Sequence, residues 1–136
     1  RRVPRDPVGM NSQTQQLLIA GAVLGFLFVA LGAFGAHGLK AVMSAEQQAW
    51  FRTGTLYLGI HAMAMLFCGV LHHLFFTRSI AISGWLFFCG ILVFSGTLFL
   101  MAVGGPRWLG AVTPIGGTLF LAGWGTLVYG ILKSRA

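Results

Sequence analysis

Two histidines that interrupt hydrophobic sequence are the residues best suited to chemistry. His37 closes the stretch GAFGAHGL, and His61 lies inside the stretch GTLYLGIHAMAM. An imidazole ring can bind a ligand or form hydrogen bonds, and burying it in lipid without a partner is costly. Tyr57 precedes His61 by one helical turn, so the two side chains share a face. For His61 we favour a hydrogen bond that connects two helices, with ligand chemistry as the alternative.

The two histidines are predicted to meet in one polar cluster near Tyr57. His37 ends the first hydrophobic stretch, and the second stretch begins on the same side of the membrane. His61 would then lie about 10 Å below the shared end, at the rise of an α-helix. The glycines and alanines before His37 would let the helix backbones approach closely, and Gly38 would end the first helix. A haem or metal held by these two histidines alone has no further support in the sequence, so we expect no cofactor and no metal.

Two arginines, Arg52 and Arg107, are predicted at the same end of the molecule as His37. Arg107 lies in the turn GGPRW, whose glycines can present backbone N–H groups. Together with the histidines, these arginines would form a cationic pocket mouth that meets a lipid phosphate or a carboxylate. The more common role of such arginines, beside a tryptophan such as Trp108, is to anchor the chain at the membrane interface. The sequence leaves both interpretations open.

The composition indicates that the elements carrying these residues lie in a membrane. Of the 136 residues, 57% are hydrophobic and 8% are charged, whereas a soluble domain is about 25% charged. A chain this apolar cannot cover a water-facing surface, and it has no room for a soluble catalytic domain. The net charge of +7 comes from basic residues at loops and chain ends. That distribution argues against a nucleic-acid partner and favours contacts with lipid headgroups.

Four hydrophobic segments are each long enough to cross a bilayer, which takes roughly 20 apolar residues. They predict an all-α fold, an integral membrane four-helix bundle. The short turns between segments require neighbouring spans to run antiparallel. Residues 10–136 form a single domain, and residues 1–9 are expected to be a disordered leader or an artificial extension. The predicted spans cover residues 17–38, 54–76, 80–103 and 109–132.

Local signals refine two of these helices. Ser44 and Gln47 match a capping box, with Glu46 in a favourable first turn, so a helix is predicted to begin near residue 45. We expect its first part to be amphipathic and to lie at the level of the headgroups before the chain enters the membrane. Three glycines of the fourth segment recur with a period of seven and fall near one helix face, namely Gly116, Gly123 and Gly130.

The charges near the spans bear on orientation and on transport. The basic residues outside residues 1–9 divide evenly between the two sides: Arg78, Lys133 and Arg135 on one, Lys40, Arg52 and Arg107 on the other. The arginines of residues 1–9 and the clustered C-terminal pair break the tie, which favours both termini inside the cell. The spans contain no Asp or Glu, which argues against proton pumping and cation transport.

Four stretches together resemble a known family. GAFGAHGL, TGTLYLGIHAMAM, FSGTLFLMAV and VTPIGGTLFLAGW are similar, in this order and spacing, to the small YgdD-type membrane proteins, a bacterial family of unknown function with small transmembrane relatives in eukaryotes. The resemblance covers roughly residues 16–132. It implies four transmembrane helices in the bacterial inner membrane with both termini inside, and it supplies no activity. The family motif residues that fall in this sequence include His37, Tyr57, His61, Ser95, Thr113, Pro114, Gly116 and Gly117.

These observations predict a membrane protein that is not an enzyme. We expect it to bind a lipid or a partner membrane protein and to support envelope integrity or assembly. The expected partners are membrane lipids, with other membrane proteins or a second copy of the chain as further partners. The alternative is a small-solute transporter or channel with a polar site near His37 and His61, and a redox or metal protein using these histidines is a weaker third. The candidate functional residues are His37, Arg52, Tyr57, His61, Arg107 and Thr113.

Overall fold

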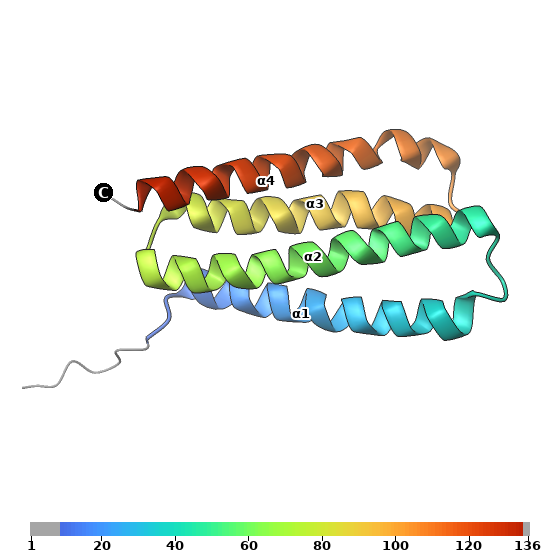
Figure 1. Cartoon of the computed structure of the whole chain (residues 1–136), viewed down its shortest axis with the longest axis horizontal. Coiled ribbons are helices and arrows are strands. Elements are labelled where there is room, and N and C mark those ends of the chain that lie inside the picture. The colour runs from blue at the N-terminus through green and yellow to red at the C-terminus, as the bar shows by residue number, and fades with distance from the viewer. Residues whose placement is uncertain (1–8, 135–136) are drawn as a thin grey trace, which may run out of the picture.

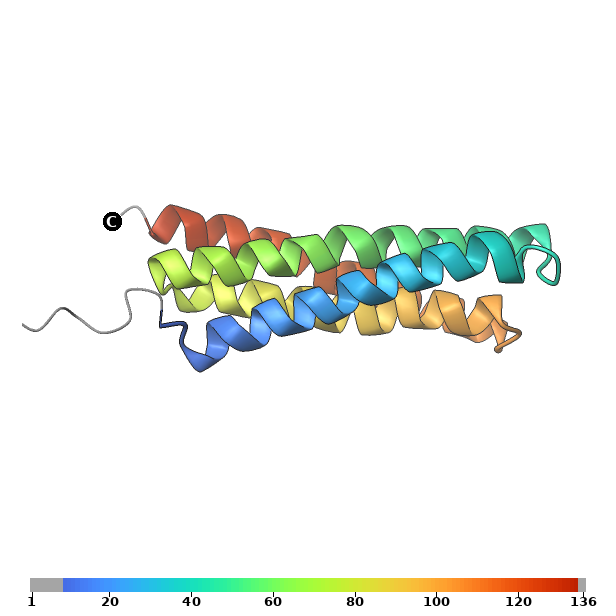
Figure 2. The same cartoon turned by 90° about the horizontal axis from the view of Figure 1, so that it is seen from below.

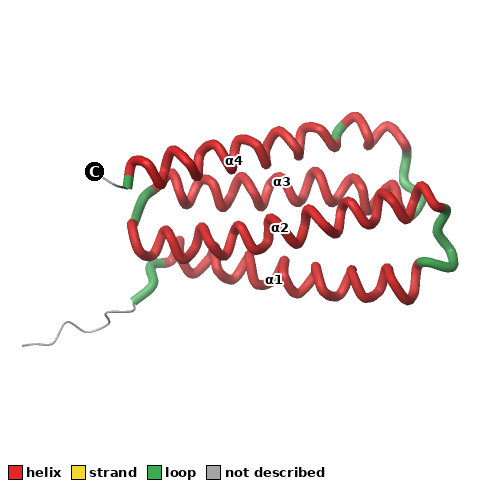
Figure 3. The backbone as a smooth tube through the Cα atoms, viewed as in Figure 1, coloured by secondary structure: helices red, strands yellow, loops and turns green. Residues whose placement is uncertain are grey.

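The computed structural model describes residues 9–134, which fold into four long α-helices (Figure 1). This part of the chain contains helices and connecting turns and no β-strand (Figure 3). The elements are α1 (Ser12–Phe34), the π-helical turn η1 (Gly35–Leu39), α2 (Ala45–Phe75), α3 (Arg78–Ala102), the 3-10 turn η2 (Arg107–Ala111) and α4 (Thr113–Lys133). The all-α prediction is therefore confirmed. Apart from Gly9, the predicted leader lies outside the described residues.

Each of the four helices is long and apolar enough to cross a membrane. The first begins earlier than predicted because Asn11 caps it, accepting a hydrogen bond from the Thr14 N–H at 2.8 Å. A cap of this kind lets the helix include polar residues that hydrophobicity alone leaves out. The predicted four-span membrane bundle is confirmed. With adjoining helical turns, the four segments run Ser12–Leu39, Ala45–Phe75, Arg78–Ala102 and Arg107–Lys133.

Consecutive helices pack side by side and run antiparallel (Figures 1 and 2). α2 and α3 form the centre, α1 packs mainly on α2, and α4 packs on α3. The core follows the central pair, where Met65, Cys68 and Phe87 are fully buried. Both ends of the described chain lie at one end of the bundle with the α2–α3 turn, which we name the terminal end. The α1–α2 and α3–α4 connections lie at the opposite end, which we name the loop end.

The start of α2 is built as the capping box predicts. The Ser44 side chain accepts a hydrogen bond from the Gln47 N–H at 3.2 Å, and the Gln47 side chain accepts one from the Ser44 N–H at 2.9 Å. The helix then continues to Phe75 without a break. The predicted start of this helix is confirmed, and the position of its first turns at the level of the headgroups stays a prediction. Residues 45–53 are continuous with the rest of α2, and Phe51 packs against Gly35 of η1.

The first helix does not end at Gly38. Its last α-helical residue is Phe34, and the π-helical turn continues through Leu39. A Cβ on Gly38 would lie 2.9 Å from the Phe34 Cε2 atom, so this glycine makes room for an aromatic ring. Positive φ angles occur in residues 9–134 at Phe76 and Gly104 instead. Single π-helical turns are frequent at functional sites, which draws attention to the loop end.

A glycine seam joins α4 to α3. Gly116, Gly123 and Gly130 are all buried on the face of α4 that meets α3. A Cβ on Gly123 would lie 2.6 Å from the Phe87 Cε1 atom, closer than real carbon atoms approach. The prediction that these glycines share a face is confirmed. In lipid, where burying apolar surface gains little, such close approach supplies the packing that holds two helices together.

Candidate functional site

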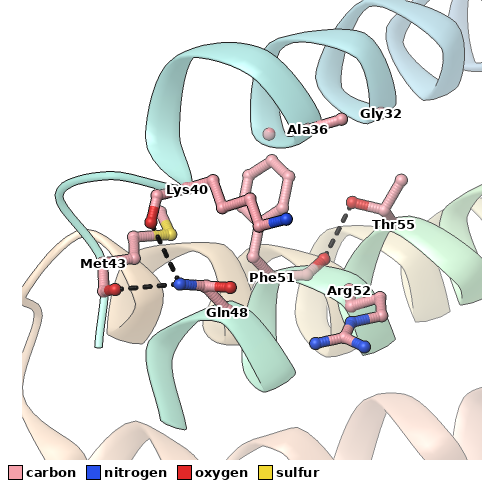
Figure 4. A pocket seen from close by; sticks show the side chains of 9 residues that line it. Gly32, Ala36, Lys40, Met43, Gln48, Phe51, Arg52 and Thr55 are labelled. Atoms are coloured by element: carbon pink, nitrogen blue, oxygen red, sulfur yellow. Dashed lines mark hydrogen bonds between the residues drawn. The ribbon is translucent and has the colours of Figure 1, made fainter. Parts of the chain in front are cut away.

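A pocket of about 310 Å³ opens at the loop end, between η1 and the first turns of α2 (Figure 4). Its walls combine small and apolar residues with two cationic side chains. We name it the loop-end pocket. The residues that line it are Gly32, Gly35, Ala36, Lys40, Met43, Gln48, Phe51, Arg52 and Thr55.

The floor of the loop-end pocket is an aromatic ring packed on a glycine. Phe51 is buried, and a Cβ on Gly35 would lie 2.8 Å from the Phe51 Cδ1 atom. A larger residue at position 35 would therefore push α1 and α2 apart. The π-helical turn begins at this glycine, beside the Phe51 ring.

Hydrogen bonds hold the connecting loop in place over the pocket. The Gln48 side-chain nitrogen donates to the Lys40 carbonyl oxygen at 3.1 Å and to the Met43 carbonyl oxygen at 3.0 Å (Figure 4). The Thr55 hydroxyl donates to the Phe51 carbonyl oxygen at 2.8 Å. The Gln48 side chain thus holds the connecting loop against α2, and its bond to the Lys40 carbonyl oxygen keeps the Lys40 backbone beside this helix.

The loop-end pocket carries positive charge without a compensating carboxylate. Lys40 and Arg52 line it, and its lining contains no acidic residue. Glu46 is the single acidic residue within residues 9–134. It pairs with Arg107 instead, and the Arg107 Nη2 and Glu46 Oε2 atoms lie 2.5 Å apart. Arg107 also lies over the Trp50 ring, 5.4 Å from its centroid. The arrangement suits recognition of an anion at the membrane surface by Lys40 and Arg52.

The structure does not bring His37 and His61 together. Contacts of Gly35 with Phe51 place the end of α1 beside the start of α2. His37 is exposed there and does not line the pocket. His61 is ten residues beyond Phe51 along α2, and His37 is two residues beyond Gly35 in the opposite direction. At 1.5 Å per helical residue, the two histidines are therefore roughly 18 Å apart along the bundle. The predicted cluster counted the depth of His61 from residue 54, the predicted start of the second span, whereas the end of the first helix lies beside Phe51, which leaves His61 deeper.

His61 lies where α2, α3 and α4 meet, and both of its ring nitrogens are engaged. Its side chain is 3% exposed. Nδ1 lies 2.8 Å from the Tyr57 carbonyl oxygen, and the Trp124 indole N–H donates to Nε2 at 3.1 Å. Because a carbonyl only accepts and an indole N–H only donates, Nδ1 carries the proton and the ring is neutral. The Phe120 ring stacks on the imidazole with centroids 3.6 Å apart. This geometry supports the helix-connecting interpretation.

Other motif residues also connect helices. The Tyr57 ring packs against Phe94 of α3, with centroids 4.5 Å apart. Thr113, at the start of α4, shares a hydrogen bond with Thr97 of α3 at 2.6 Å. The Ser95 hydroxyl of α3 donates to the Gly54 carbonyl oxygen of α2 at 2.7 Å. Of the six candidate residues, Arg52 alone lines the loop-end pocket.

Sequence reasoning missed two contributors to the pocket, Lys40 and Gln48. Gln48, Arg52 and Thr55 follow the spacing i, i+4, i+7, which places them on one face of a helix. Once Ser44 is taken as the cap of that helix, this polar face could be found from the sequence. Lys40 carries no comparable signal, because its position depends on the path of the connecting loop.

Comparison with known proteins gives a consistent family assignment. The family described as a protein of unknown function (DUF423) matches residues 31–117. The chain is similar to a UPF0382 membrane protein of Staphylococcus saprophyticus, 42% identical over 85% of this chain and 96% of the relative. It is also similar to the UPF0382 membrane protein of Haemophilus influenzae, 44% identical over 85% of this chain and 92% of the relative.

A third relative carries a more specific name. The UPF0382 inner membrane protein YgdD of Escherichia coli K12 is 39% identical over 88% of this chain and 91% of the relative. No solved structure matches the chain. The resemblance predicted from the four sequence stretches is confirmed: this chain belongs to the DUF423 family of unknown function and is related to the UPF0382 membrane proteins, YgdD among them.

Proposed function

We propose that the protein is a non-enzymatic binder of an anionic lipid headgroup, which it holds in the loop-end pocket with Lys40 and Arg52. The observation that supports this most directly is the pairing of Glu46 with Arg107, which leaves the two pocket cations without a carboxylate. An anion that enters the pocket replaces that missing partner. Charge-assisted hydrogen bonds to phosphate are about twice as strong as neutral ones.

A membrane lipid fits this pocket better than a soluble anion does. Half of its wall is apolar or small, including Phe51, Met43 and Ala36. Large apolar side chains of the neighbouring helices remain exposed, among them Phe28 of α1 and Leu56 of α2. Such surfaces give acyl chains a place to pack while the headgroup meets the cations. A bound lipid of this kind would serve envelope integrity or assembly.

The proposed location is the bacterial inner membrane, with both termini inside the cell. The support for the membrane is the printed name of the Escherichia coli relative, an inner membrane protein. The support for the orientation is the distribution of basic residues described above. In this orientation the loop-end pocket opens on the side away from the cytoplasm.

The alternative function, transport of a small solute past His37 and His61, has less support. The two histidines lie at different depths, and His61 has no free ring nitrogen. Beside His61, the interior is filled by Phe87 and Phe120. The structure thus offers His61 as a contact between helices rather than as the wall of a pathway.

Native mass spectrometry of the gently extracted protein tests the proposed function. We would titrate phosphatidylglycerol and phosphatidylcholine of equal chain length into the wild type and into a variant carrying Lys40→Gln and Arg52→Gln. The wild type should prefer the anionic lipid, and the variant should bind it about tenfold more weakly, a difference of about 1.4 kcal/mol.

The matched control carries Lys133→Gln and Arg135→Gln, which removes the two positive charges of the C-terminal sequence KSRA and leaves the Glu46–Arg107 pair in place. It should keep the preference for phosphatidylglycerol within about twofold, since exposed charges act weakly at a distance. Equal weakening in both double variants would show general charge attraction and would overturn the pocket as the binding site.

A further inference from the structure

A second pocket, of about 380 Å³, lies at the terminal end of the bundle. Residues of α1, α2 and α3 form it together with the turn between α2 and α3. We name it the terminal-end pocket. Its lining contains no acidic residue and consists of Gln13, His72, Phe76, Arg78, Ala81 and Ile82.

His72 contributes a buried ring that is held from one side. Its side chain is 6% exposed, and Nδ1 lies 2.8 Å from the Thr14 hydroxyl of α1. Within residues 9–134, Nε2 has no hydrogen-bond partner, although the ring forms part of the pocket wall. In the tautomer whose Nδ1 accepts from the Thr14 hydroxyl, Nε2 carries the proton and can donate it into the pocket. Nε2 is not itself a buried atom, so a ring N–H there is open to an anion that enters the pocket.

The N-terminus of α3 lies beside the same pocket, which its first residue, Arg78, lines. Its cap residue, Thr77, makes no side-chain hydrogen bond to the first turn. The Thr77 hydroxyl instead pairs with the Ser134 hydroxyl at 2.7 Å. The first backbone N–H groups of a helix have no partner within the helix, and the helix dipole favours negative charge there. Arg78, the first residue of α3, carries a guanidinium group on the pocket wall.

We propose that the terminal-end pocket is a second anion site, which binds a phosphate group with His72, Arg78 and the N-terminus of α3. The donors are of the kinds that bind phosphate in proteins: a guanidinium, a ring N–H and uncapped backbone N–H groups. Gln13 adds an amide that can donate to the same ligand. The phosphate belongs either to a lipid headgroup of the second leaflet or to a soluble phosphate compound. The site shares no lining residue with the loop-end pocket, so either proposal can fail without the other.

The test uses the full chain in a non-ionic detergent, with Lys40→Gln and Arg52→Gln already in place to silence the loop-end pocket. Inorganic phosphate and short-chain phosphatidylglycerol are titrated separately by calorimetry. We expect at least one of the two to bind. Binding of inorganic phosphate identifies a soluble phosphate as sufficient, and binding of phosphatidylglycerol alone identifies the lipid as the source.

Two variants and two matched controls locate the binding. Arg78→Gln and His72→Gln should each weaken binding about tenfold, the effect of losing one charge-assisted or buried hydrogen bond. Lys133→Gln removes a positive charge at the same end, and His73→Gln changes the adjacent histidine, which does not line the pocket. Both controls should change binding less than about twofold.

Two results would overturn the proposal. One is that neither anion binds the protein in the silenced background. The other is that Lys133→Gln weakens binding as much as Arg78→Gln does. That result would show that the anion responds to the net charge of the protein and not to the terminal-end pocket. Arg78 is exposed, so its replacement leaves the fold intact and decides the outcome even if His72→Gln lowers stability through the lost contact with Thr14.

Discussion

Replacing Trp124 by phenylalanine removes the hydrogen bond between α4 and α2 while keeping an aromatic ring in place. The His61 Nε2 atom then loses its donor in a site where the side chain is 3% exposed. An unsatisfied buried acceptor costs about 1–3 kcal/mol in soluble proteins, whereas hydrogen bonds between transmembrane helices average about 0.6 kcal/mol. We therefore expect Trp124→Phe to lower the free energy of unfolding by about 1 kcal/mol through this bond.

The assay is reversible unfolding in mixed micelles with increasing dodecyl sulfate, followed by circular dichroism. Trp85→Phe is the matched control, because Trp85 packs edge-to-face on Phe88 and its indole makes no hydrogen bond within residues 9–134. Trp124→Phe should destabilise the protein more than the control does. Combining Trp124→Phe with His61→Phe should give less than the sum of the two single effects, because both changes remove the same interaction.

Two outcomes would refute this reasoning. Equal losses in Trp124→Phe and Trp85→Phe would show that only ring volume matters at these positions. Strict additivity of Trp124→Phe and His61→Phe would show that the two side chains do not interact. Either result would remove the support for His61 as a contact between helices and would return ligand chemistry to consideration for this residue.

Two further predictions concern packing between helices. Gly123→Ala should destabilise the protein by about 1–3 kcal/mol, because a Cβ there would overlap the Phe87 ring, and the same unfolding assay measures it. Gly125→Ala, on the same helix, meets no atom within 4 Å and should leave stability unchanged or slightly raised; equal losses at both positions would contradict the seam. Ser95→Ala should cost about 1 kcal/mol by leaving the Gly54 carbonyl without its side-chain donor, whereas an unchanged unfolding midpoint would show that this bond contributes nothing.

Hydrophobicity and capping rules predict most of this fold. Four long apolar segments with short turns leave an antiparallel bundle as the simple solution. The Ser44–Gln47 pair predicts the start of α2 at Ala45, and the helix does begin there. The period of the α4 glycines predicts the face that meets α3. These features are local, so each can be derived from a short stretch of sequence.

The contacts of His61 could not be predicted in the same way. Its partner Trp124 lies on α4, which is apolar on nearly every face. In such a helix, hydrophobic periodicity does not say which side turns toward α2. The distance between His37 and His61 depends on how far α1 slides along α2, and the contact of Gly35 with Phe51 sets that position. A prediction that aligns the end of the first helix with residue 54 instead of with Phe51 therefore brings His61 too close to His37.

The position of α1 at the edge of the bundle has a mechanical consequence. This one helix, with its π-helical turn, supplies walls to both pockets: Gly32, Gly35 and Ala36 at one end and Gln13 at the other. Its main contacts are with α2, whereas α2 and α3 are each packed between two neighbouring helices. A tilt about its midpoint would widen one pocket while narrowing the other. Because α1 and its π-helical turn line both pockets, a change in the position of this helix relative to α2 would alter both ends of the bundle at once.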